Sequence, residues 1–230
     1  MSGVTGPNLV TDGLIMYLDA GNAQSYSGSG NTWYDLSGNG YDATINGTNH
    51  WVSTDGGWFD RANDTQNTNY VALEADAAQA TGAYYTIEFW MWPHTPSTTG
   101  YWNSMASSGN DNYNIYNQLT SSKLGKYTGT GDISYTSREK FILTVVRNNS
   151  DTGSWYKNGA LATTMTATTI FTGVADGGWI LDQEQDSIGG GFQVGQNYRG
   201  GFAQVRLYNR VLTAAEITQN YNAHKSRYGL

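Results

Sequence analysis

Oxygen-bearing side chains are concentrated in the segment Trp179–Phe202, WILDQEQDSIGGGFQVGQNYRGGF. A short apolar run stops at Asp182, and Glu184, Gln185 and Asp186 follow before three consecutive glycines. So many carboxylates do not belong in a packed core, because an unpaired buried charge is costly. Two interpretations remain open. The segment is either a solvated acidic loop with a glycine hinge, or a loop that wraps its oxygens around a hard cation such as calcium, which takes about six to eight oxygen ligands.

Aromatic residues form a second candidate site. The stretch Tyr85–Trp92 reads YTIEFWMW, and its alternation places Ile87 on one face of a strand with Trp90 and Trp92 on the other. Because both faces are bulky, we expect a central strand covered by the core on one side and by a partner or loop on the other. The two tryptophans are either a sugar-stacking platform or aromatics buried under that cover.

A polar turn follows Trp33. Asp35, Ser37 and Asn39 alternate just before a Gly-Tyr pair, in YDLSGNGYDAT, and Asn-Gly suits a tight turn. Short polar side chains of this kind commonly bond to their own backbone. We therefore interpret the three residues as turn-forming rather than ligand-binding.

Composition predicts one all-β domain. The chain has 230 residues, 29 Gly, 8 Trp, 17 Tyr and only 13% charged residues, which favours strands joined by turns. The net charge of −7 argues against a nucleic-acid partner, and no basic run suggests a membrane surface. Cysteine is absent, which excludes a disulfide framework and a thiol nucleophile. Without an evident signal peptide, we expect synthesis in the cytoplasm.

Short strands recur along the chain with turns between them. We expect an N-terminal arm over residues 1–12 and a single domain over residues 13–230. We expect an early buried strand at residues 13–20, a long central strand at 85–92, a core strand at 141–147 and a last alternating strand at 202–208. Two short strands at 57–60 and 70–73 lie on either side of an Asn/Thr/Gln loop. Hairpins are expected at 101–117 and at 155–161, the second turning at Asn-Gly. The spacing of Thr213 and Glu216 is that of a helix capping box, so one short amphipathic helix should follow. The fold class is an antiparallel jelly-roll sandwich.

Several of these stretches, taken in order, resemble one family. YDLSGNGYDATINGT, the central strand, SWYKNGAL and GGFAQVRLYNRVLTAAEI are similar to the laminin G-like and pentraxin branch of the concanavalin A-like lectin/glucanase jelly rolls. The segment LDQEQDSIGGGF adds a further likeness, because it resembles the calcium loop of pentraxins.

The resemblance implies a calcium site shared by two segments. It makes Glu184 and Asp186 bridging carboxylates, gives Gln185 a backbone carbonyl ligand, and places Asp111-Asn112 at the tip of the predicted hairpin as the second half of the site. A second ion in the family uses a Glu and a Gln where this chain has, respectively, Gln193 and Gln196. Loss of one carboxylate predicts one well-formed calcium site and a weak or empty second one.

The segments GLIMYLDAGNAQSY and YNAHKSRYGL also resemble laminin G-like modules of tailed bacteriophages, which implies a virion component. The expected function is therefore that of a lectin-like virion protein that binds a glycan or another surface ligand with the help of calcium. The alternative is a capsid decoration or cement protein that makes only protein contacts. Either role implies a homo-oligomer or a particle-associated chain on the virion surface.

We expect no catalytic activity. The three histidines, His50, His94 and His224, have no distinctive neighbours. Glycosidases of the same superfamily carry a Glu-X-Asp-X-Glu strand, which this sequence lacks. Glu184 and Asp186 come close to that spacing, but they precede the triple glycine, where calcium explains them better. A glycoside hydrolase remains the alternative.

Overall fold

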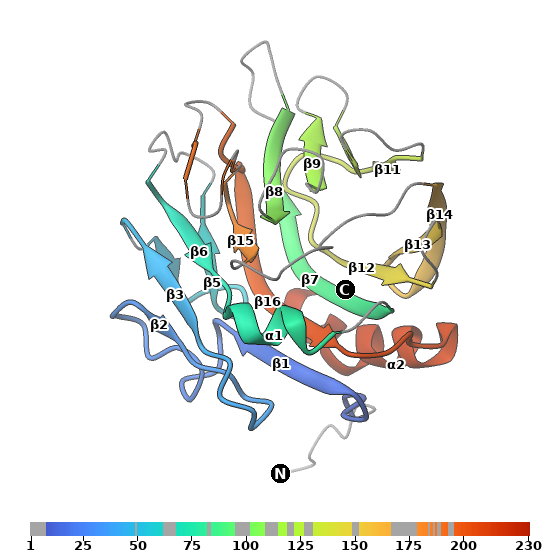
Figure 1. Cartoon of the computed structure of the whole chain (residues 1–230), viewed down its shortest axis with the longest axis horizontal. Helices are drawn as coiled ribbons and strands as arrows, with labels where there is room; N and C mark the ends of the chain where they lie inside the picture. Colours follow the sequence, from blue (N-terminus) through green and yellow to red (C-terminus); the bar gives the residue numbers. More distant parts are fainter. Residues whose placement is uncertain are drawn as a thin grey trace.

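The protein is a sandwich of two antiparallel sheets, seen in a computed structural model (Figure 1). The structure describes residues 8–48, 50–61, 68–81, 84–94, 102–108, 115–118, 122–126, 131–148, 152–166, 179–183, 185, 187, 190–192 and 196–230. The expected fold class is confirmed.

Sheet A holds eight of the strands in the described part of the chain. In spatial order they are β14 (Ala160–Thr166), β13 (Thr152–Lys157), β12 (Phe141–Arg147), β7 (Tyr85–Pro93), β16 (Gly200–Tyr208), β5 (Trp58–Asp60) and β4 (Trp51–Val52), with β1 (Leu14–Asp19) also paired to β16.

Sheet B faces sheet A and also has eight described strands. Their order is β11 (Ile133–Ser134), β10 (Lys123–Lys126), β9 (Ile115–Gln118), β8 (Trp102–Ser108), β15 (Trp179–Leu181), β6 (Tyr70–Ala72), β3 (Ala43–Asn46) and β2 (Thr32–Trp33). The expected hairpin is confirmed as the antiparallel pair β8–β9. The two short strands around the Asn/Thr/Gln loop are β5 and β6, but they do not pair with each other, because one lies in each sheet.

Local sequence explains the β13–β14 hairpin. Asn158 and Gly159 both have positive φ, 53° and 80°, as a tight hairpin turn requires. The register pairs Lys157 with Ala160, so the turn joins the strands directly.

The main core lies between the sheets. Sheet A contributes alternate residues of its central strands, such as Phe89 of β7 and Leu143 of β12, both completely buried. Sheet B contributes Trp179 and Leu181 from β15. The apolar run that opens the oxygen-rich segment is therefore a core strand.

A β-bulge changes the predicted alternation of β16. The register against β7 shifts between Phe202 and Gln204. Phe202 therefore joins Val205 in the core between the sheets, whereas Ala203 packs with Trp90 on the opposite face. Strict alternation would place Ala203 on the same face as Val205, and the extra residue of the bulge is the physical reason for the difference.

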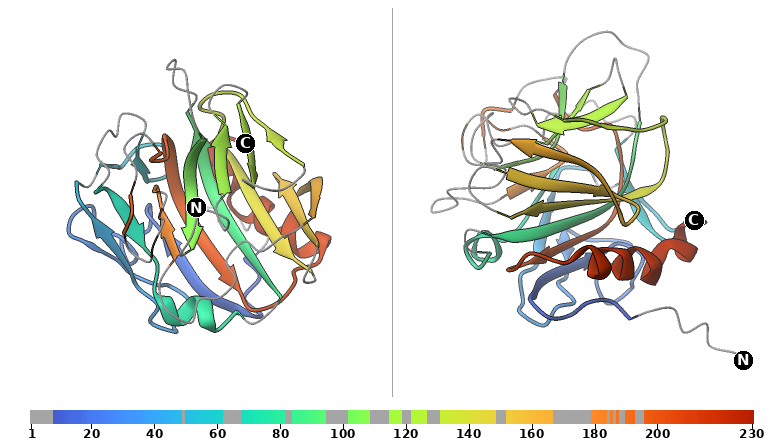
Figure 2. Two further views of the ribbon diagram at one scale, coloured as in Figure 1. Left: turned by 45° about the horizontal axis from the view of Figure 1, so that its top comes forward. Right: turned by 90° about the vertical axis from the view of Figure 1, so that its right-hand side faces the viewer.

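A helix covers the outer face of sheet A. The expected terminal helix is α2 (Ala214–His224), which continues into the 3₁₀ helix η2 (Lys225–Tyr228) and lies outside the sandwich (Figure 2). Its capping box is confirmed: Thr213 Oγ1 accepts from the Glu216 N–H, and the Glu216 carboxylate accepts from the Thr213 N–H at 2.8 Å. A further short helix, α1 (Ala75–Gln79), was not expected. Among the described helices, none is long and apolar enough to cross a membrane.

The cover of α2 and η2 over sheet A is layered along the strands. Leu212 and Ile217 pack near Tyr208, over the N-terminal end of β7. A polar layer around Glu88 comes next, and then Trp90 lies under η2. The order of these layers decides which part of the outer face stays open.

Candidate functional site

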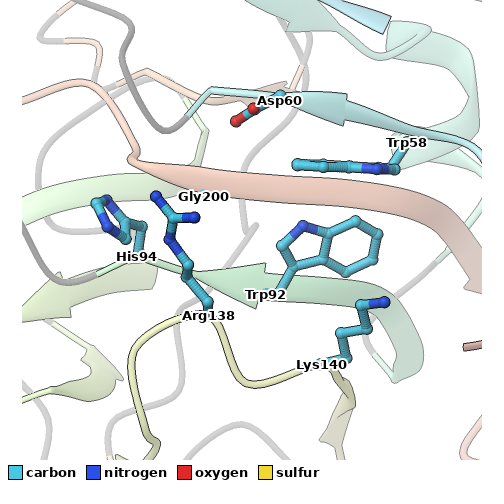
Figure 3. Close-up of a pocket in the computed structure, with 7 residues that line it drawn as sticks. All are labelled: Trp58, Asp60, Trp92, His94, Arg138, Lys140 and Gly200. Carbon is cyan, nitrogen blue, oxygen red and sulfur yellow. The ribbon is translucent and has the colours of Figure 1, made fainter. Parts of the chain in front are cut away.

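A pocket of about 340 Å³ opens on the outer face of sheet A where the helical cover ends. Tyr228, the last residue of η2, packs on Trp90 with ring centroids 4.4 Å apart and reaches Trp92 at 6.2 Å. Among the described residues, no helix covers the next step along the strands. The lining comes from four neighbouring strands or their ends: Trp58 and Asp60 of β5, Trp92 and His94 at the end of β7, Arg138 and Lys140 before β12, and Gly200 of β16 (Figure 3).

Two indoles form the apolar part of the pocket. Trp58 and Trp92 lie on either side of β16 and meet edge to face, with centroids 4.6 Å apart at 61°. They can meet because Gly201 lies between them: a Cβ there would come within 2.5 Å of both rings. The missing side chain on β16 therefore creates the aromatic contact. Trp92 is nearly buried, and Trp58 is half-buried.

Two basic groups line the pocket, Arg138 across from the indoles and Lys140 beside Trp92. Arg138 is exposed at the tip of a turn, with φ of 66°, and its N–H donates to the Pro93 carbonyl at 2.7 Å. Lys140 lies 5.6 Å from the centre of the Trp92 ring and forms an ion pair with Asp55 at 2.7 Å. Such a cation–aromatic contact is attractive and holds the lysine over the pocket.

His94 is a half-buried member of the lining. Burial lowers the pKa of its imidazole, the charges of Arg138 and Arg199 lower it further, and Asp60 raises it. Its Nδ1 is buried without a hydrogen-bond partner in the described structure, and the same holds for Nε1 of Trp58. Unpaired buried polar atoms are rare in folded proteins. Both residues line the pocket, with these two atoms themselves buried.

The prediction that Trp90 and Trp92 form a sugar-stacking platform is wrong for Trp90. Trp90 is completely buried, and Tyr221 stacks on it with centroids 6.1 Å apart. A covered ring offers no face to a sugar. Trp92 instead pairs with Trp58, which comes from a strand distant in sequence. The expectation that this face of the central strand is covered is confirmed at Trp90, but the cover is the terminal helix α2 with η2 rather than a partner or a loop.

The predicted turn around Asp35 is structural. Its carboxylate accepts from the N–H groups of Tyr17 and Ser37 at 2.8 and 2.9 Å. The Ser37 hydroxyl and the Asn39 amide both donate to the Ile15 carbonyl, at 2.9 and 3.0 Å. These side chains bond to backbone, as the turn interpretation predicts.

The oxygen-rich segment is described only in part. Asp182 is buried and forms an ion pair with the buried Arg61 at 3.0 Å, so this carboxylate anchors the loop to the core. Gln185 is fully buried, and Gln196 is half-buried. Most of the proposed calcium ligands lie outside the described residues: Asp111, Asn112, Glu184, Asp186 and Gln193.

The strands that carry the two proposed halves of the calcium site are neighbours. Ser108, the last residue of β8, is opposite Trp179, and Ala106 is opposite Leu181, after which the acidic loop begins. Within the described ranges, no three His, Asp or Glu side chains converge on one point. Calcium at these positions stays a prediction.

Sequence reasoning missed most of the pocket, namely Trp58, Asp60, His94, Arg138 and Lys140. Alternation gives the side of the sheet to which Trp58 and Trp92 point. It does not reveal that β5, β16 and β7 are neighbours, because long-range pairing decides this. The one available signal was the Gly200–Gly201 pair that opens β16, since glycine in a strand often marks a close approach.

The comparisons with known proteins give a partial match to a family model and a likeness in fold. Residues 141–227 match the Pentaxin family model. The matched part is well under half of the chain and runs from β12 to η2. No curated protein matches the chain.

Solved structures resemble nearly the whole chain. One is the Trypanosoma rangeli sialidase in complex with the inhibitor DANA (TM-score 0.64, 14% identity, 99% of this chain and 35% of that one). Others are the binding domain of botulinum neurotoxin DC in complex with SialylT (0.65, 15%, 93% and 52%) and the binding domain of Paraclostridial Mosquitocidal Protein 1 (0.65, 16%, 93% and 53%). The chain thus spans between a third and about half of these proteins. At such identities the likeness shows the fold alone, a sandwich of two antiparallel sheets.

Proposed function

We propose that this chain is a non-catalytic carbohydrate-binding module and that its glycan site is the Trp58–Trp92 pocket. One observation carries the proposal: an aromatic pair and several hydrogen-bonding groups converge in one concave site on a lectin fold. The C–H groups of a sugar ring pack well against the negative face of an indole. Its hydroxyls need donors and acceptors, which the His94 and Asp60 side chains of the lining would supply.

The pocket suits a small ligand. Its volume of about 340 Å³ is at the lower end of the range for ligand sites. The pocket has a buried floor, which includes Trp92 and Gly200, and an exposed rim, which includes Arg138. The complex of a botulinum neurotoxin binding domain with SialylT, on a similar fold, supports a glycan as the ligand class.

A non-catalytic role agrees with the lining of the pocket. Most glycoside hydrolases use two carboxylates placed about 5–10 Å apart. Among the described lining residues, Asp60 is the one carboxylate. Hydrolysis of a polysaccharide panel by the wild-type chain, lost in Glu184→Gln, would contradict a purely binding role.

Glycan-array binding in calcium and in chelator tests the proposed function. We expect binding in at least one condition, followed by loss of that binding in Trp58→Ala. The matched control is Tyr34→Ala, because Tyr34 is an aromatic residue exposed to 50% and is not among the residues that line the pocket. Absence of binding on the array in both conditions, or binding unchanged in Trp58→Ala, would count against the proposal.

The proposal extends to a virion context and to calcium. The likeness of two segments to phage modules supports the virion context. The loop at Glu184 and Asp186 supports calcium binding. Calcium there would order the acidic loop and the hairpin after β8. The alternative is a decoration or cement protein that makes only protein contacts. Reconstruction of a particle that contains the chain distinguishes the glycan-binding role from the cement role, because a cement protein would bury the Trp58–Trp92 pocket or bind no glycan.

A further inference from the structure

The Trp58–Trp92 pocket is a basic site on an acidic protein. The chain has 12 Lys and Arg against 19 Asp and Glu, a net charge of −7. Two of those basic residues, Arg138 and Lys140, nevertheless line the pocket, and Arg199 is close enough to affect His94. The charge of the pocket lining is therefore opposite in sign to the net charge of the whole chain.

Carboxylates offset only part of this charge. Lys140 is paired with Asp55, and Asp60 lies in the lining. Arg138 is different, because its guanidinium has no hydrogen-bond or ion-pair partner in the described part of the chain. A guanidinium group without a partner can bind a carboxylate through two parallel hydrogen bonds.

The turn that carries Arg138 is held from both sides. The Glu139 N–H donates to the Thr136 carbonyl, and the Thr136 N–H donates to the Glu139 carboxylate, both at 2.8 Å. Arg138 itself has left-handed backbone, which is uncommon outside glycine and asparagine. The base of the Arg138 side chain is thus fixed beside Pro93 and next to the pocket.

Arg138 and the aromatic surface lie at opposite ends of the pocket, whereas Lys140 lies beside Trp92. Figure 3 draws the indoles of Trp58 and Trp92 on one side and the His94 ring with the Arg138 guanidinium on the other. A ligand that fills the pocket therefore meets an apolar surface at one end and a cation at the other. A pyranose that carries a negative group has both properties in one small molecule.

We propose that the pocket selects an acidic sugar, with the sugar ring against Trp58 and Trp92 and the carboxylate on Arg138. This inference rests on the proposed function, because it names the chemical class of glycan that the same site takes. It also predicts that binding weakens as salt is added, because the rim cation is exposed and screened.

Titration with matched sugar pairs tests the inference. Glucuronate is compared with glucose, and sialyllactose with lactose, by calorimetry on the full chain. We expect the acidic member of each pair to bind about 10- to 100-fold more tightly, as one hydrogen-bonded charge pair allows. Glucose 6-sulfate forms a third arm, and we expect it to bind more weakly than glucuronate.

Arg138→Met should remove the preference for the acidic member of each pair. The control is Lys123→Met, which removes an exposed cation paired with Asp132 on sheet B and should keep the preference. Thermal unfolding of both variants checks the fold. Equal affinity for both members of each pair, a preference that survives Arg138→Met, or tighter binding of the sulfate would overturn the inference. Absence of binding to neutral and acidic sugars alike would instead contradict the proposed function.

Discussion

Glu88 of β7 and Arg206 of β16 form an ion pair at 3.1 Å with both side chains completely buried. The pair lies beneath α2, from which the Asn220 amide donates to the Glu88 carboxylate at 3.0 Å. Thr144 of β12 donates to the other carboxylate oxygen at 3.1 Å. Burial raises the pKa of Glu88, and Arg206 with these two donors lowers it in part. Three strands and the helix therefore meet at one carboxylate.

Glu88→Ala should destabilise the fold strongly. The substitution leaves Arg206 buried without its counter-charge, which typically costs about 3–5 kcal/mol. Urea unfolding measures the change, and Glu88→Ala combined with Arg206→Met should recover part of it. Lys123→Ala breaks an exposed pair, with side chains exposed to 40% and 30%, and should cost about 1 kcal/mol or less. Similar losses for the two single variants would contradict the prediction.

Stability should fall as the pH drops from about 6.5 to about 4. The pKa of His224 is lowered from 6.5 to about 4, first by burial and then by Arg206 and Arg227, while Asp19 opposes the shift. In this window the unfolded chain binds a proton that the folded chain does not, so stability rises with pH and is lost on acidification. At about 1.4 kcal/mol per pKa unit, the effect is on the order of 3 kcal/mol.

His224→Gln tests that assignment through chemical unfolding at several pH values. The slope of stability against pH between about 4 and 6.5 should flatten in this variant. His50→Gln is the control, because His50 is exposed. A slope that persists in His224→Gln would assign the pH dependence to other groups.

Gly201→Ala should damage the pocket and the fold together. A Cβ would lie 2.5 Å from both the Trp58 and the Trp92 rings, so at least one indole must move. Such overpacking costs about 1–3 kcal/mol. We expect lower thermal stability, altered tryptophan fluorescence and weaker glycan binding. Wild-type fluorescence and binding in this variant would show that the close contact of the two rings is not needed.

Affinity for an acidic sugar should rise as the pH falls below about 6.5. Burial, Arg138 and Arg199 lower the pKa of His94 from 6.5, against the weaker effect of Asp60. A bound carboxylate would raise the pKa of His94, so binding would take up a proton. Calorimetry in buffers of different ionisation enthalpy measures that uptake. Affinity for the neutral partner sugar is the control and should not rise in the same way.

Calcium should stabilise the chain through the acidic loop. Calcium at about one hundred times its dissociation constant raises the free energy of unfolding by about 2.7 kcal/mol. Thermal unfolding in calcium and in chelator measures the shift, and Asp186→Asn should abolish it. The pocket variant Trp58→Ala should keep it. A wild-type chain that shows no shift in millimolar calcium has no such site.

The sequence by itself determined the elements of this protein. Alternation in YTIEFWMW placed Glu88 and Trp92 on one face of the central strand, the Asn158–Gly159 pair set a hairpin, and Thr213 with Glu216 started the helix. Each of these depends on neighbours within a few residues, where backbone geometry and hydrogen bonding act locally. The oxygen-rich loop was likewise visible from its residue types.

Only the tertiary structure decided the site. Trp58 and Trp92 meet because β5 and β7 both pair with β16, and strand order depends on burial across the whole domain rather than on any local pattern. The same reason explains why Trp90 is covered and Trp92 lines a pocket, although both lie on one strand face: η2 ends at Tyr228, between them. Where a helix stops over a sheet is set by packing, and that packing leaves the pocket open.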